Sequence, residues 1–248
     1  MTPEIDAAFD AVRRVHGKNS LERVEEMLYG DGQTRHPLQR EAKWILPGIS
    51  QRPWHDPYEH PDIEPIVRAF EAAHSSIKEE LSIAWQQNRQ EFADYEHYLM
   101  RQQNWQALYL FKSGELVPES GRLVPTAMRV LTEEAVNTGR HCELLEAHFS
   151  TLLPNATIKP HCDLWNFSIN LHLAIEVPEG CAIRVAEETR EWEEGKCLLF
   201  DYSFEHEAWN RGTSPRTCLL VDLWHPETTV AERQGLTALV TAVRSLGS

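Results

Sequence analysis

The spacing of apolar residues divides the chain into two parts of different character. In the first part, apolar residues recur every three or four positions, which is typical of amphipathic helices. This pattern predicts helices over residues 4–15, 20–29, 63–92 and 127–137. Asp62 and Thr126 are placed to cap the last two of these helices, and Gly139 to end the fourth. A run over residues 105–112 is expected to form a strand.

The second part, from about residue 146, consists of short runs of β-forming residues broken by Pro, Gly and Asn. We expect strands over residues 147–153, 166–175, 181–185, 196–201, 206–210 and 216–223. Two segments, residues 171–175 and 218–221, are rich in aliphatic residues and should lie inside a sheet. Six or more short strands at this spacing predict a sandwich or a barrel.

A closing helix is predicted over residues 229–246. Its inward-facing stripe would be formed by Val230, Leu236, Leu239, Val240 and Val243. The chain has 248 residues, of which 42% are hydrophobic, and it contains no internal repeat or linker-like tract. This composition is sufficient for one large core, so we expect a single domain spanning residues 1–248.

Charge and cysteine content narrow the possible partners and the compartment. The net charge of -14 and the pI near 5.3 argue against a polyanionic partner such as nucleic acid. The N-terminus lacks the basic start and apolar run of a signal peptide, and the sequence contains no apolar stretch long enough for a membrane span. The five cysteines form no CxxC pair. We therefore expect a cytoplasmic protein with free thiols and no membrane partner.

Three residues of the strand-rich part suggest a metal site. His161 and Asp163 are two positions apart, so on an extended strand their side chains would leave the same face. His206 follows at the start of a later predicted strand. Two imidazoles and one carboxylate on one face of a metal leave the opposite positions open, which suits non-haem Fe(II). The same ligands could hold zinc, so the residue types alone do not fix the metal.

Arg216 begins the last predicted strand. A cation is rare in so apolar a run unless an anion pairs with it. One interpretation is an anionic ligand bound near the metal, and the other is an ordinary ion pair at the end of a strand.

Around these residues the chain resembles the aspartyl/asparaginyl β-hydroxylase family, whose members are iron- and 2-oxoglutarate-dependent oxygenases. The resemblance runs from about Trp44 to Pro226. It is strongest in IKPH at 158–161, LHL at 171–173, WEEGK at 192–196, FDYSFEHEAW at 200–209 and VDLWHP at 221–226. It implies an α+β fold with a double-stranded β-helix (jelly-roll, cupin-like) core over residues 146–226. Residues 1–140 would then be mainly helical support, and residues 229–246 the C-terminal helix.

The resemblance also implies roles for individual residues. His161 and His206 match the two iron-binding histidines of the family. Arg216 matches the arginine that pairs with the distal carboxylate of 2-oxoglutarate, and Ser150 and His172 match residues that help to bind this cosubstrate. A guanidinium suits such a role because it donates two parallel, charge-assisted hydrogen bonds.

The chain departs from the family pattern at two of these positions. Asp163 stands where the best-known members have glycine, so the carboxylate ligand that they lack is restored here. Asn170 stands where the family has an arginine that binds the cosubstrate. Either 2-oxoglutarate lies differently in this protein, or Asn170 contacts the substrate instead.

We therefore expect a dioxygenase that uses Fe(II), 2-oxoglutarate and O2 to oxidise a C–H bond, with hydroxylation as the default outcome. Desaturation or cyclisation remains open, whereas halogenation is disfavoured because Asp163 occupies the position that a halide would need. The family suggests a small amino-acid-like substrate, possibly carrier-bound, or an aspartyl or asparaginyl residue. The alternatives are a non-catalytic, metal-retaining cupin-like binding or sensing protein, and a zinc hydrolase on the same barrel.

Several neighbouring residues have a structural and a functional interpretation. Asn166 could orient a metal ligand or bond within a turn, and Asp201 and Glu205 could support His206 or be solvated loop carboxylates. Cys162 should face away from the metal as a buried thiol. The segment 52–55 either lines the mouth of the substrate site or packs against the core.

Overall fold

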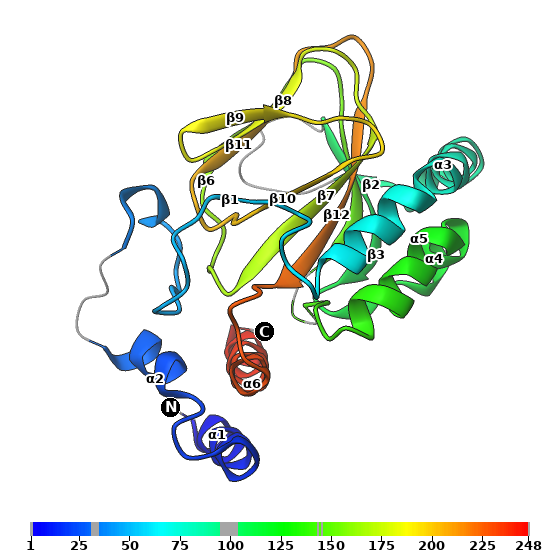
Figure 1. Ribbon diagram of the computed structural model, residues 1–248. Coiled ribbons are helices and arrows are strands. Elements are labelled where there is room, and N and C mark those ends of the chain that lie inside the picture. The colour runs from blue at the N-terminus through cyan, green and yellow to red at the C-terminus, as the bar shows by residue number, and fades with distance from the viewer. Residues whose placement is uncertain (1, 31–34, 95–103, 143, 145, 248) are drawn as a thin grey trace.

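Two antiparallel sheets packed face to face form the centre of the molecule. The computed structural model describes residues 2–30, 35–94, 104–142, 144 and 146–247. Within these residues, one sheet has eight strands in the order β1-β10-β7-β12-β5-β3-β2, with β4 paired to β3. The other has four strands in the order β6-β11-β8-β9. This arrangement confirms the α+β fold with a jelly-roll core, and Figure 1 shows the small sheet lying across from the large one.

The strands, as the structure has them, are β1 Trp54–His55, β2 Ala93–Asp94, β3 Trp105–Lys112, β4 Glu115–Leu116, β5 Ala147–Leu152, β6 Ala156–His161, β7 Ser168–Glu176, β8 Cys181–Val185, β9 Glu188–Glu191, β10 Cys197–Phe200, β11 His206–Asn210 and β12 Arg216–Trp224. Every strand predicted from the sequence is present within a few residues of its expected bounds. The two aliphatic segments lie in β7 and β12, which are interior strands of the large sheet as predicted.

The helices are α1 Pro3–His16, α2 Glu22–Tyr29, α3 Glu64–Gln87, α4 Pro118–Leu123, α5 Pro125–Val130 and α6 Val230–Gly247, with a π-helical turn over Leu131–Val136 and 3-10 turns over Pro37–Gln39 and Arg89–Glu91. Helices α3, α4 and α5 cover the outer face of the large sheet, whereas α1, α2 and α6 gather at one end of the molecule (Figure 1). The chain before residue 140 thus supplies helices and also strands β1 to β4 of the large sheet.

Three details of the predicted helices are wrong. Asp62 does not cap α3, because its carboxylate pairs with Arg140 and Ile63 occupies the cap position. Thr126 lies inside α5 and donates its N–H and its hydroxyl to Glu80 of α3. Val230 is 53% exposed, because the first turn of α6 faces its neighbour Ala231 inward instead.

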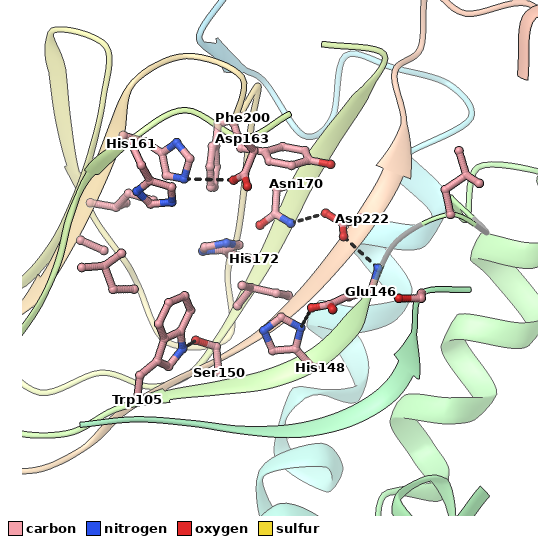
Figure 2. Close-up of a pocket in the computed structure, with 18 of the residues that line it drawn as sticks. Trp105, Glu146, His148, Ser150, His161, Asp163, Asn170, His172, Phe200 and Asp222 are labelled. Carbon is pink, nitrogen blue, oxygen red and sulfur yellow. Dashed lines mark hydrogen bonds and ion pairs between the residues drawn. The ribbon is translucent and has the colours of Figure 1, made fainter. Parts of the chain in front are cut away.

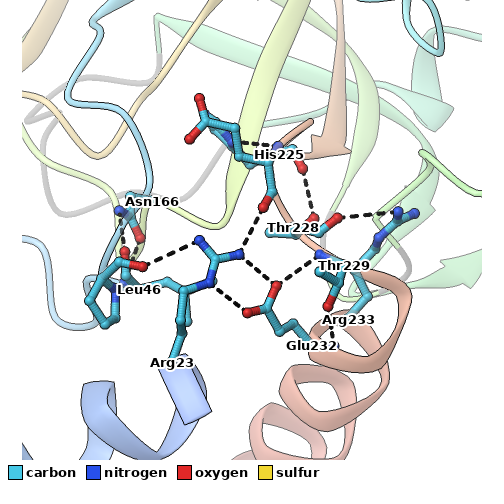
Figure 3. A network of polar contacts seen from close by, with 10 residues as sticks. Arg23, Leu46, Asn166, His225, Thr228, Thr229, Glu232 and Arg233 are labelled. Carbon is cyan, nitrogen blue, oxygen red and sulfur yellow. Dashed lines mark hydrogen bonds and ion pairs between the residues drawn. The ribbon is translucent and has the colours of Figure 1, made fainter. Parts of the chain in front are cut away.

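A polar network connects the N-terminal helices to the rest of the fold (Figure 3). The Arg23 guanidinium of α2 donates to both carboxylate oxygens of Glu232 in α6, each at 2.7 Å, and to the backbone oxygens of Glu227 and Pro47. Glu232 also accepts the N–H of Thr229 and so caps its own helix. These contacts join α2, α6 and the segment that follows Leu46.

Candidate active site

The period-two alternation of β7 separates an apolar face from a polar one. Ile169, Leu171 and Leu173 point outward into the core beneath the helices, whereas Asn170 and His172 line the space between the sheets. The neighbouring strands follow the same rule, so polar residues of β5 and β12 face the same space: His148, Ser150, Arg216 and Asp222. The result is a cavity of about 240 Å³ between the two sheets.

Strand pairing brings the three predicted metal ligands to one end of this cavity. His206 is the register partner of His161 in the β6–β11 pair, and their ring centroids are 4.1 Å apart. Asp163 lies beyond the end of β6, which ends at His161. The prediction that the two side chains leave the same face of one strand is therefore wrong. The N–H of Asp163 bonds to the oxygen of Tyr202 at 3.0 Å, which turns the chain back toward the histidines. One ligand atom from each of the three residues lies within 4.8 Å of the others (Figure 2).

Backbone carbonyl groups fix the orientation of the two imidazoles. Nδ1 of His161 lies 2.7 Å from the oxygen of Lys159, and Nδ1 of His206 lies 2.9 Å from the oxygen of Phe204. Since a carbonyl oxygen only accepts, each Nδ1 carries its proton and each Nε2 keeps a lone pair. This support is typical of metal-binding histidines.

The protonation states also suit metal binding. Burial and the neighbouring His161 lower the pKa of His206 to about 3, so this imidazole is neutral at neutral pH. Enclosure between the sheets raises the pKa of Asp163 to about 6. The Asp163 side chain nevertheless keeps 40% of its surface accessible, and it lies 3.5 Å from His206. At pH 7 His206 is therefore neutral and the Asp163 carboxylate is mostly ionised.

Arg216 lies at another side of the cavity, where none of the described residues gives it an anionic partner. Its side chain is 1% exposed, and Nε and Nη1 have no hydrogen-bond partner. No carboxylate among the described residues forms an ion pair with it; the ring of Trp192, 4.5 Å from the guanidinium carbon, is its close contact. The predicted alternative of a strand-end ion pair is therefore wrong. A buried guanidinium without a counter-ion is costly, which favours a site built for a bound anion.

Two further donors face the same part of the cavity. Trp105 donates its indole N–H to the Ser150 hydroxyl at 2.8 Å, so the Ser150 proton remains available for a ligand. Trp192 donates to Nδ1 of His172 at 3.3 Å, so the proton of this imidazole resides on Nε2. Burial holds the pKa of His172 well below its usual value, which keeps the ring neutral. Arg216, Ser150 and His172 thus present donors to one small volume.

Asn170 is held by a buried carboxylate. Its Nδ2 donates to Oδ1 of Asp222 at 2.7 Å, and the N–H of Glu146 donates to Oδ2 at 2.9 Å. Burial raises the pKa of Asp222 to about 7. Figure 2 shows the Asn170 amide oxygen on the side away from Asp222, toward the centre of the cavity.

The remaining predicted residues have structural contacts. Asn166 bonds to both backbone groups of Leu46, which favours the turn interpretation. Asp201 is fully buried and accepts from Ser203, so it is neither solvated nor bonded to His206. Glu205 pairs with Arg184.

Cys162 is half-buried rather than buried, with its thiol directed at the oxygen of Leu38. Trp54 packs against Phe200 and does not line the cavity, so segment 52–55 has the packing role.

A second group of potential ligands lies outside the cavity. His55, Glu59 and His60 bring ligand atoms close together. However, Arg52 already pairs with Glu59, and the two imidazoles bond to each other at 3.2 Å. We assign this group a structural role.

Two residues with close contacts to the site were not given a role from the sequence. Trp192 contacts both Arg216 and His172, and Asp222 orients Asn170. The available signal for Asp222 was a carboxylate inside the aliphatic run of β12, where an acid is rare without a partner. For Trp192 the sequence carried no signal beyond its place in a resemblance motif.

The fold and the cavity define a jelly-roll protein with a His-Asp-His candidate metal site. Residues 71–226, more than half of the chain, match the family model "Aspartyl/Asparaginyl beta-hydroxylase". The chain belongs to the aspartyl/asparaginyl β-hydroxylase family, which confirms the resemblance noted in the sequence.

The chain is 31% identical to the aspartyl/asparaginyl β-hydroxylase of Mus musculus over 93% of its length, and it covers 30% of that relative. It is likewise 31% identical to the human aspartate β-hydroxylase domain-containing protein 2, over 82% of this chain and 55% of the relative. The chain thus spans about a third to a half of the length of these proteins. None of its described helices combines enough length and apolar character to cross a bilayer.

Among solved structures, the chain is similar to a prolyl-4-hydroxylase of Pseudomonas putida. The TM-score is 0.43 and the sequence identity 16%, over 61% of this chain and 87% of the other. This likeness concerns the fold alone.

Proposed function

We propose that the protein is an Fe(II)- and 2-oxoglutarate-dependent dioxygenase that hydroxylates a C–H bond of an amino acid, an amino-acid derivative or an aspartyl or asparaginyl residue. His161, Asp163 and His206 would hold the iron, and Arg216, Ser150 and His172 would hold the far carboxylate of 2-oxoglutarate. Bound iron, 2-oxoglutarate and O2 together would supply the oxidising chemistry.

The observation that carries this proposal is the pairing of two complementary sites in one cavity. A set of two imidazoles and a carboxylate suits ferrous iron with open positions. The buried guanidinium of Arg216, whose Nε and Nη1 have no hydrogen-bond partner among the described residues, favours a bound anion. A cosubstrate with a metal-chelating end and a carboxylate at its other end satisfies both requirements at once.

The residues of the chain have simple tasks in this mechanism. The lone pairs on Nε2 of His161 and His206 and the Asp163 carboxylate would hold the metal. Arg216 and its two neighbouring donors would orient the cosubstrate, and the ring of Trp192 would hold the guanidinium in place for it. The enclosing sheets exclude bulk solvent from the reacting groups.

Two properties of the molecule follow as part of the proposal. We treat residues 1–248 as one oxygenase domain, because strands of the large sheet come from both halves of the chain. We place the protein in the cytoplasm on account of its unpaired cysteines, and its partner is a small amino-acid-like molecule.

The test measures succinate formation and oxygen consumption by protein loaded with Fe(II), 2-oxoglutarate and a panel of amino acids and short aspartyl or asparaginyl peptides. We expect substrate-dependent succinate formation that requires both iron and oxygen. Turnover with zinc in the absence of oxygen would identify a hydrolase instead. Binding of 2-oxoglutarate without any turnover would identify a binding or sensing protein.

A further inference from the structure

Trp192 lies where the chain crosses from one sheet to the other. It directly follows β9 of the small sheet, and the turn after it leads into β10 of the large sheet. This turn is fixed to the large sheet, because the N–H of Gly195 donates to the oxygen of Ala174 at 2.9 Å. Trp192 is 5% exposed and is not among the described residues that line the cavity. It can therefore act on a ligand only through the side chains that it contacts.

The ring face of Trp192 contacts Arg216. The guanidinium carbon lies 4.5 Å from the centroid of the indole. A cation above an aromatic ring is attracted by the π electrons, so this contact occupies none of its N–H groups. Nε and Nη1 have no hydrogen-bond partner among the described residues. The indole thus holds the guanidinium and leaves its donors available for an anion.

The edge of the same indole selects one tautomer of His172. Nε1 of Trp192 donates to Nδ1 of His172 at 3.3 Å, and the two ring planes differ by only 10°. The N–H bond therefore runs nearly parallel to the plane that holds the Nδ1 lone pair. A proton on Nδ1 would set two donors against each other, so the imidazole carries its proton on Nε2. Phe200 also packs edge to face against this imidazole, with the ring centroids 4.8 Å apart.

One indole thus controls two of the three donors that face the proposed distal carboxylate. Without Trp192 the guanidinium would lose its support. The imidazole could then also carry its proton on Nδ1 and present a lone pair to the carboxylate, which repels it. Ser150 is held separately, by the indole N–H of Trp105. Its hydroxyl would remain a donor after a change at Trp192.

We infer that Trp192 is a positioning residue that makes this side of the cavity selective for a 2-oxo acid with a second carboxylate. The inference rests on the proposed function and identifies the residue that determines its cosubstrate preference. 2-Oxoglutarate and 2-oxovalerate share the metal-chelating end and differ at the far end, where the first has a carboxylate and the second a methyl group. The ratio of their affinities therefore measures the anion site separately from the metal site.

The test titrates anaerobic, Fe(II)-loaded protein with each of these two acids and follows the visible absorption band that chelation of ferrous iron produces. Trp192→Phe keeps an aromatic face and loses the N–H, whereas Trp192→Leu loses both. We expect the preference for 2-oxoglutarate to fall by about threefold to tenfold in Trp192→Phe, because one hydrogen bond is lost. In Trp192→Leu it should fall by at least about thirtyfold. The affinity for 2-oxovalerate should change little in either variant.

Trp54 provides the matched control. It is also buried, its ring also contacts an arginine, Arg190, and its Nε1 has no hydrogen-bond partner among the described residues. Trp54→Phe should therefore leave the preference for 2-oxoglutarate unchanged. An equal fall in Trp54→Phe and Trp192→Phe would show a general loss of packing and would contradict the inference.

Nitrogen-15 NMR of histidine-labelled protein reads the tautomer of His172 directly. Zinc replaces iron in this experiment, because ferrous iron broadens the signals, and the His172 signals are identified by their loss in His172→Gln. We expect the proton on Nε2 in the wild type and a mixture of both tautomers in Trp192→Phe. A wild type with the proton on Nδ1 overturns the inference.

The inference and the proposed function fail in different ways. If the wild type shows no visible band with 2-oxoglutarate, the proposed function fails and the inference with it. If the band forms and both Trp192 variants keep the full preference for 2-oxoglutarate over 2-oxovalerate, only the present inference fails.

Discussion

At the scale of single residues, the proposed role of Arg216 implies a side chain that binds a ligand at the expense of stability. Its guanidinium is buried, stacked on Trp192 and without a hydrogen-bond partner at Nε and Nη1. In a protein without bound anion this arrangement is unfavourable, since a buried charge is normally paired. Ligand binding would remove this cost.

Arg216→Met is therefore expected to separate stability from binding. The ligand-free variant should be as stable as the wild type or more stable, by on the order of 1–4 kcal/mol, because a buried charge is replaced by an apolar chain. It should lose the rise in melting temperature that 2-oxoglutarate causes in the metal-loaded wild type.

The matched control for this substitution is Arg190→Met. Arg190 also stacks on a tryptophan, Trp54, but it pairs with Glu188 outside the cavity. Its loss should leave the response to 2-oxoglutarate intact. A destabilised Arg216→Met protein that still responds to 2-oxoglutarate would refute the assigned role.

Asp163→Ala should weaken metal binding strongly. Loss of a side chain that only hydrogen-bonds to a metal ligand weakens metal binding by up to about 100-fold. Removal of a ligand itself is therefore expected to reduce Fe(II) affinity by at least about this factor. Anaerobic competition with a metal-binding dye measures this change. Glu205→Ala, in the nearby loop but paired with Arg184, is the control. Unaltered iron affinity in Asp163→Ala would show that the carboxylate is not a ligand.

At the scale of elements, strand β6 shows where sequence patterns stop being informative. It supplies His161, yet no strand was predicted there, because Lys159 and Pro160 break the expected alternation. Proline lacks an N–H and is tolerated on edge strands, and among the described strands β6 is an edge of the small sheet that pairs only with β11. His161 was identified as a candidate ligand from its spacing to Asp163 and from the family resemblance, not from a predicted strand.

The interior strands were predictable for a physical reason. Strands β7 and β12 are covered by helices on one face and line the cavity with the other. Because neither face is exposed to bulk solvent, these strands contain more aliphatic than polar residues, and this composition predicts an interior strand. The hydrogen bond between Asn170 and Asp222 was not predictable, since register across two strands 52 residues apart is set by tertiary packing.

Asn166 connects the segment around Leu46 to the sheets, and its removal should be costly. Asn166→Ala leaves the buried N–H and C=O of Leu46 without these partners, so we expect a loss of about 1–3 kcal/mol in the free energy of unfolding. Denaturant unfolding measures the loss, with Asn19→Ala at an exposed turn as the control. Equal stability of the two variants would contradict this assignment.

At the scale of the whole molecule, the buried carboxyl of Asp201 should shape the dependence of stability on pH. Burial raises its pKa to about 7 in the folded state, against about 3.9 in an unfolded chain. The folded protein therefore holds this proton between about pH 4 and 7 while the unfolded chain has released it. Its contribution to stability is present at low pH and is lost as the pH rises to about 7.

Asp201→Asn removes this titration. The variant should gain stability relative to the wild type as the pH is raised from 5 to 8, which melting temperatures measured across that range will show. Asp56→Asn, with an exposed carboxylate, should follow the wild type. If the difference between Asp201→Asn and the wild type stays constant with pH, the buried carboxyl does not titrate in this window.

The architecture as a whole places two unlike candidate sites in one cavity. The proposed metal ligands lie on β6, on β11 and in the loop after β6, and the proposed anion site lies on β5, β7 and β12. The most direct measurement is an anaerobic spectroscopic titration of the Fe(II)-loaded protein with 2-oxoglutarate. The account predicts a saturable visible band in the wild type that is lost in Asp163→Ala and greatly weakened in Arg216→Met. A wild type that binds one ferrous ion but shows no band at any concentration of 2-oxoglutarate would contradict it.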